Sequence, residues 1–114
     1  MAGTDFEEIV VQRDGDRDIR FVGKLLASFE SSPSDSSVYY SGRANFWTEL
    51  ELYQTKGGKF VCQRIECSSW GNYRNEYHAA VCENESQVLS FFGYSVIAKE
   101  LYDNAGISTA VEVE

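Results

Sequence analysis

Apolar and polar residues alternate along the middle of the chain, over residues 45–67, and the pair Gly57-Gly58 interrupts the alternation once. Side chains of a β-strand point alternately to the two faces of its sheet. A glycine pair tolerates the positive φ angles that a tight two-residue turn requires. The pattern therefore predicts a β-hairpin with these two glycines at its tip.

A two-residue turn also predicts which residues of the hairpin face each other. In this register Glu49 lies opposite Glu66, Glu51 lies opposite Arg64, and one face of the hairpin is richer in aliphatic side chains. The aliphatic face carries Phe46, Thr48, Leu50, Leu52, Val61, Gln63, Ile65 and Cys67. The other face carries Trp47, Glu49, Glu51, Tyr53, Phe60, Cys62, Arg64 and Glu66. We expect the aliphatic face to meet the core, because a shift by one residue would bury the acidic set.

Further strand patterns lie on both sides of the hairpin. Residues 5–12 end in a β-branched run that favours a strand, with a short helix over 5–11 as the alternative. Asp14-Gly15 indicates a turn, and residues 19–31 predict a longer strand in which Gly23 marks a bulge or close packing. On one face of that strand we expect Phe21, Gly23, Leu25, Ala27 and Phe29. Residues 38–40 begin another strand, and residues 73–83 form the last.

The C-terminal part changes to a helical period. Asn84 with Gln87 three residues later resembles a capping box, and Gly93 is a usual residue after a helix end. A second helix is expected over residues 95–105, and Gly106 ends it. Its apolar stripe is expected to comprise Ile97, Ala98, Leu101 and Ala105.

Strands followed by helices predict an α+β fold, in which an antiparallel meander of four to five strands carries two C-terminal helices on one face. The 114 residues suggest a single domain over 1–114. We expect frayed ends at 1–4 and 108–114, and a mobile loop at 31–37, which holds five serines and the sole proline.

The net charge of −8 is concentrated at the two ends, since residues 1–18 carry −4 and residues 83–114 carry −5. Such a balance argues against direct binding of nucleic acid, which needs clustered lysine and arginine, and favours a basic partner. No apolar run approaches the ~20 residues of a membrane span. The first residues do not resemble a signal peptide, so we expect a cytoplasmic protein.

Few residues suggest metal or catalytic chemistry. The set Cys62, Cys67, His78 and Cys82 has residue types that suit zinc, but its spacing is poor and free thiols are the preferred interpretation. The triplet of aspartates at 14, 16 and 18 resembles the opening of a calcium loop, but it lacks the later ligands. With a single histidine, a nucleophilic site would have to use His78. We expect no cofactor and no enzymatic activity.

The mixture of rings and carboxylates on the second hairpin face suggests a binding surface. The candidate partner-binding residues are Trp47, Glu49, Glu51, Tyr53, Phe60 and Glu66. Aromatic rings supply contact area and carboxylates select a basic protein, so we expect an interaction module, in its sharper form an inhibitor or decoy of a basic nucleic-acid-binding protein. Three alternatives remain open: an ordinary solvated face, a ligand-binding or enzymatic domain with a site near His78, and a homodimer joined at a strand edge.

Overall fold

The computed structural model describes residues 6–31, 46–68, 74–110 and 113. Five antiparallel strands form one sheet in the order β1-β2-β3-β4-β5, so every strand pairs with its neighbour in sequence. Two helices follow the sheet. The elements are β1 (Glu7–Val11), β2 (Ile19–Glu30), β3 (Phe46–Thr55), β4 (Phe60–Ser68), β5 (Glu76–Cys82), α1 (Glu85–Phe92) and α2 (Val96–Ala105). This arrangement confirms the predicted meander with C-terminal helices, and it resolves residues 7–11 as a strand rather than a helix.

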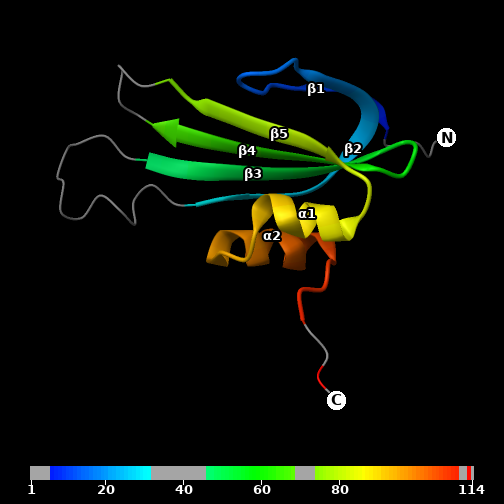
Figure 1. Cartoon of the computed structure of the whole chain (residues 1–114), viewed down its shortest axis with the longest axis vertical. Coiled ribbons are helices and arrows are strands. Elements are labelled where there is room, and N and C mark those ends of the chain that lie inside the picture. The colour runs from blue at the N-terminus through cyan, green and yellow to red at the C-terminus, as the bar shows by residue number, and fades with distance from the viewer. Residues whose placement is uncertain (1–5, 32–45, 69–73, 111–112, 114) are drawn as a thin grey trace.

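Both helices cover the same face of the sheet, as Figure 1 shows. We call it the helix face and the opposite side the far face. α1 lies over β4 and β5, and α2 lies over β2 and β3. The main core forms between these layers, where Leu52, Cys62, Val88, Leu101 and Tyr102 have no exposed surface. The helices are held here by burial of apolar area, which is the dominant favourable contribution to folding.

The ends of the helices follow the predicted signals. The Asn84 side chain accepts a hydrogen bond from the backbone N–H of Gln87 at 3.0 Å, and Ser95 caps α2 through the N–H of Ala98 at 3.3 Å. Gly93 and Gly106 both adopt positive φ angles after the last helical residues. Such caps satisfy backbone groups that have no partner within the helix.

The apolar stripe of α2 was predicted incompletely, because it lacked Tyr102. That ring is fully buried, and its hydroxyl donates to the carbonyl oxygen of Gly93 at 2.6 Å. The bond ties the second helix to the end of the first.

The turn of the central hairpin differs from the prediction, and the difference changes the register. The N–H of Thr55 donates to the carbonyl oxygen of Lys59 at 2.8 Å, and the carbonyl oxygen of Thr55 accepts from the N–H of Gly58 at 3.0 Å. The loop therefore has three residues, 56–58, and Gly58 has a φ of 96°. A three-residue loop that ends in a left-handed glycine is a common alternative to the two-residue turn.

The longer loop moves every residue of β4 to the face opposite to the predicted one. Glu49 lies opposite Ile65 and Thr48 lies opposite Glu66. Leu50 and Leu52 point to the helices as predicted, but they are joined there by Phe60, Cys62, Arg64 and Glu66. The far face instead receives Val61, Gln63, Ile65 and Cys67. This one-residue shift is the most important correction to the sequence-based account.

β2 contains a β-bulge between Leu25 and Ala27. The bulge separates the five residues that were expected to share a face, so Ala27 and Phe29 point to the helices whereas Leu25 lies opposite Tyr53 on the far face. Close packing at Gly23 is confirmed, because a Cβ atom there would collide with the carbonyl oxygen of Gln54 and with the Phe21 ring. The glycine and the bulge are thus two separate features of this strand.

The far face is partly covered, because β1 curls over it (Figure 1). Val11, Ile19 and Val61 form a second, smaller buried cluster there. Gln63 is buried next to it and donates to the carbonyl oxygen of Gln12 at 2.8 Å. Burial of an amide is tolerated when such a bond replaces its hydration. Part of the far face remains exposed, including the β2 side chains at positions 25, 28 and 30.

The predicted strand start at 38–40 and the predicted fraying of 1–4 lie outside the described residues. Of the mobile loop predicted at 31–37, only Ser31 is described, and its backbone N–H donates to the Thr48 carbonyl oxygen at 2.9 Å. Ile107, the residue before the tail predicted at 108–114, is buried. Neither described helix has the length and apolar character needed to cross a membrane.

Candidate functional site

The structure divides the six predicted partner-binding residues between the two faces of the sheet. Trp47, Glu49, Glu51 and Tyr53 lie on the far face, because alternate residues of β3 share a side. Phe60 and Glu66 lie on the helix face, opposite Gln54 and Thr48. The expected pairing of Glu49 with Glu66 is therefore wrong, and so is the pairing of Glu51 with Arg64. The three-residue turn is the physical reason for both errors.

Glu66 and Phe60 have structural partners on the helix face. Glu66 accepts a hydrogen bond from the Thr48 hydroxyl at 2.9 Å, and its second carboxylate oxygen lies 3.0 Å from Nε of Arg64. Phe60 packs against the main core. The guanidinium of Arg64 also lies over the Phe91 ring, 6.0 Å from its centroid. Glu66 and Phe60 therefore help to hold the sheet–helix layer together. Glu66 also lines, with Trp47, a hollow of about 210 Å³ at the end of the sheet.

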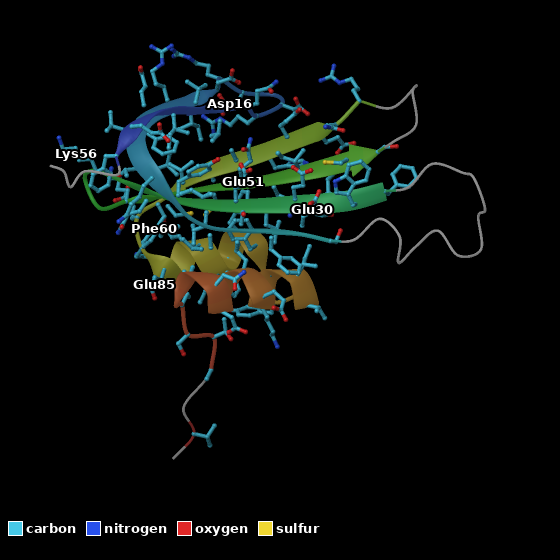
Figure 2. All side chains as sticks on the ribbon, turned by 180° about the vertical axis from the view of Figure 1, so that it is seen from behind. Asp16, Glu30, Glu51, Lys56, Phe60 and Glu85 are labelled. Carbon is cyan, nitrogen blue, oxygen red and sulfur yellow. The ribbon has the colours of Figure 1, made fainter. Side chains whose placement is uncertain are left out.

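On the far face, Glu30 lies beside the β3 carboxylates, although it was not among the residues predicted from the sequence. Glu30 of β2 lies directly opposite Glu49, and Ser28 lies opposite Glu51. Figure 2 labels Glu30 and Glu51 on these two neighbouring strands. A shallow hollow of about 360 Å³ lies between residues 28–30 and 49–51. The bulge in β2 sets the side on which Glu30 emerges. The one signal for it in the sequence is the run of three apolar residues at 25–27, which interrupts strict alternation.

Each of the two β3 carboxylates is oriented by an aromatic donor two residues away. The indole Nε1 of Trp47 donates to Glu49 at 3.1 Å, and the Tyr53 hydroxyl donates to Glu51 at 2.7 Å. Burial, and then the hydrogen bond and charge of Glu51, raise the pKa of Tyr53 far above its ordinary value. Tyr53 therefore keeps its proton and stays a donor. Its ring also packs edge-on against Phe21, with centroids 5.5 Å apart.

We call Glu30, Glu49 and Glu51 the acidic row, and no lysine or arginine of the described residues forms an ion pair with it. Like charges that lie directly opposite each other in a sheet are destabilising. The local negative potential also reaches the buried thiol of Cys67. Burial first, and the Glu49 carboxylate second, raise the pKa of Cys67 to about 11.

The four metal candidates do not converge. Cys62 and Cys82 lie together on the helix face, with their sulfur atoms 3.6 Å apart, but Cys67 is on the far face. His78 lies opposite Arg64, and its Nε2 is 3.7 Å from a Glu76 oxygen. No group of three or more metal-ligating side chains occurs in the part of the chain that the structure describes.

The aspartates at 14, 16 and 18 have local structural partners. Asp14 lies 3.6 Å from Arg74 and accepts from the backbone N–H of Tyr77 at 3.0 Å. Asp16 pairs with Arg13 at 3.7 Å. Asp18 accepts from the Arg13 N–H at 3.4 Å. The Asp14 bonds hold the β1–β2 loop against the edge of β5, whereas Asp16 and Asp18 bond to Arg13 within the loop.

Carboxylates and aromatic rings thus lie next to one another on the far face of β3. Half-buried rings flank the two β3 carboxylates, and Glu30, at the rim, is exposed. Oriented carboxylates of this kind can accept bonds from lysine and arginine side chains. The chain matches no protein-family model, no curated protein and no solved structure.

Proposed function

We propose that this protein is a non-enzymatic interaction module that binds a basic partner protein through the acidic row and the two rings beside it. The observation that carries the proposal is the pairing of Glu30 with Glu49 across the β2–β3 ladder. This contact is unfavourable in the free protein, and a lysine or arginine from a partner would relieve it. Complementary charge of this kind provides fast association and selectivity for the partner.

The aromatic neighbours support the same role. Trp47 and Tyr53 are half-buried, so each presents part of a ring next to a carboxylate. Tryptophan and tyrosine are enriched among the residues that contribute most to binding energy, because they bury a large area with few rotatable bonds. The hydrogen bonds to Glu49 and Glu51 hold the carboxylates in position before a partner arrives, which lowers the entropy cost of binding.

More specifically, we propose that the module acts in the cytoplasm as an inhibitor or decoy of a basic nucleic-acid-binding protein. Surfaces that bind nucleic acid present rows of lysine and arginine to phosphates. A row of carboxylates on a sheet would compete for those cations. The net charge of −8 supports this form, since it attracts basic surfaces over distances longer than direct contact.

The proposal is tested by affinity capture with a charge-reversed variant and a matched control. Glu30→Lys with Glu49→Lys reverses two charges of the acidic row. Glu100→Lys with Asp103→Lys reverses two exposed charges on α2, in the opposite layer. Both variants change the net charge from −8 to −4. Proteins captured from a lysate of the native host are identified by mass spectrometry, and the dissociation constant of the enriched partner is measured for all three proteins.

We expect the wild type and the α2 variant to bind the same basic protein, and the acidic-row variant to bind it at least about tenfold more weakly. Binding should also weaken as salt is added, because exposed charges are screened. Equal affinity of the acidic-row variant, or no partner enriched on the wild type, would overturn the proposal. The sharper form requires, in addition, that duplex DNA or RNA competes with the module for its partner.

A further inference from the structure

β5 is the last strand of the sheet, and the direction of its backbone groups can be determined from Tyr77. The N–H of Tyr77 donates to Asp14 Oδ2 at 3.0 Å, and its carbonyl accepts from the Asp14 N–H at 2.8 Å. Both groups therefore point away from β4. In a strand, every second residue directs its backbone groups to the same side. Those of Ala79 and Val81 must then also point outward from the sheet.

The open part of this edge has two defined ends. Asp14 occupies it at Tyr77, and the side chain of Gln87 accepts from the N–H of Glu83 at 2.7 Å. Between these ends, the outward N–H and carbonyl groups of Ala79 and Val81 have no hydrogen-bond partner within the described residues. Proteins usually protect such edges with charged side chains, bulges or proline. Residues 79–81 are Ala-Ala-Val and carry none of these.

A hollow of about 550 Å³ lies along the same edge. One side is lined by residues 13–16 of the β1–β2 loop, and the other by Ser90 and Phe91 of α1. Ala79 and His78 line it between these walls. Asp16 is labelled on the far-face side of the sheet in Figure 2, whereas α1 lies on the helix side in Figure 1. At Ala79 the open edge is thus flanked on both sides, so that a single extended strand fits better there than a second folded domain.

We propose that the edge of β5 binds an extended peptide segment of a partner chain, which adds to the sheet as a sixth strand. The four backbone groups of Ala79 and Val81 supply the ladder bonds, as in other cases of strand addition. Alternate peptide side chains then face the two walls. Val81 is 48% exposed, so an apolar, β-branched residue suits the far-face side. An aromatic or aliphatic residue suits the side of Phe91. This site is separate from the acidic row and does not depend on the proposed function.

The test is selection from a random heptapeptide display library on the wild-type protein, followed by affinity measurements on synthetic copies of the enriched peptides. Val81→Pro removes an edge N–H and blocks strand addition, yet it breaks no bond to β4, since proline is tolerated on edge strands. Val81→Thr keeps the N–H and the shape and is the matched control. Ala79→Pro is the second blocking variant, and thermal unfolding establishes that each variant is folded.

We expect enriched peptides that alternate apolar with other residues, and whose affinity falls about tenfold on Val81→Pro but less than about twofold on Val81→Thr. Methylation of alternate peptide amides should abolish binding. If Val81→Pro does not fold, Ala79→Pro decides the result.

Lack of enrichment, or peptides that bind both proline variants as tightly as the wild type, would overturn the inference. A dimer in sedimentation that Val81→Pro dissociates without peptide would also overturn it, by assigning the edge to a second copy. The Glu30→Lys and Glu49→Lys variant should bind these peptides normally, which separates this site from the acidic row.

Discussion

Glu30 lies directly opposite Glu49 in the β2–β3 ladder, and both side chains leave the sheet on the far face. Like charges directly opposite each other destabilise a sheet, and cross-strand pairs in general contribute roughly 0.2–1 kcal/mol each. The neighbouring carboxylate of Glu51 belongs to the same row. Repulsion among these carboxylates makes the free protein less stable than a neutral surface would, and a bound cation would reduce this repulsion.

Neutralising Glu30 should therefore stabilise the free protein. We expect Glu30→Gln to raise the free energy of unfolding by roughly 0.2–1 kcal/mol, because it removes the repulsion but leaves the Trp47–Glu49 hydrogen bond intact. Urea unfolding at low salt measures this change. The control is Glu100→Gln on the exposed side of α2, which removes the same charge elsewhere and should change stability less. Destabilisation by Glu30→Gln would mean that this carboxylate has a favourable partner.

Gly23 should be intolerant of any side chain. In Gly23→Ala, the new methyl group would collide with the Gln54 carbonyl oxygen and the Phe21 ring. Overpacking of this kind costs typically 1–3 kcal/mol. Gly57→Ala is the control, since the nearest atom to a Cβ there is the Thr55 hydroxyl oxygen at 3.8 Å. Thermal unfolding of the two variants should differ clearly. Similar melting temperatures would show that β2 and β3 separate easily at this point.

The buried thiols and tyrosines make the protein sensitive to alkali. Burial raises the pKa of Cys67 from about 9 to about 11 and that of Tyr102 from about 10 to about 12. The unfolded chain therefore releases these protons at lower pH than the folded protein does. The contribution to stability is complete below about pH 9 and is lost as the pH rises toward 11 and 12.

Denaturant unfolding across this pH range measures the effect. We expect the free energy of unfolding to fall less steeply between about pH 9 and pH 11 in Cys67→Ala than in the wild type, because one of the titrating groups is gone. The slope is the relevant quantity, since the substitution also removes buried volume. Identical slopes would contradict the assignment of Cys67 to a buried position beside Glu49.

The layers of the fold could be predicted from the sequence, because local signals determine them. Alternation marked the strands, and Asn84, Gly93 and Gly106 marked the helix ends. Tyr102 was overlooked although it lies four residues after Ala98, a spacing that places both on one side of a helix. A buried hydroxyl needs a hydrogen-bond partner, and the Gly93 carbonyl, which local spacing does not reveal, supplies it.

The site was only partly predictable, because it depends on two single-residue details. The turn after Thr55 has three residues, and Gly57-Gly58 is compatible with a two-residue or a three-residue loop. The bulge at 25–27 decides the side on which Glu30 emerges. Alternation assigns side chains to faces only relative to a turn or a bulge. An error of one residue at either place therefore moves every side chain of the strand beyond it to the opposite face. Trp47, Glu49, Glu51 and Tyr53 were grouped correctly because they lie on one uninterrupted strand.

The most direct test of the acidic row compares two single charge reversals in the same hairpin. Glu49→Lys and Glu66→Lys make the same change in net charge, but the two side chains lie on opposite faces of the sheet. The dissociation constant of the captured basic partner is measured for both. The far-face account predicts at least about tenfold weaker binding for Glu49→Lys and a change of less than about twofold for Glu66→Lys. Equal weakening by the two variants, or an effect of Glu66→Lys alone, would contradict it.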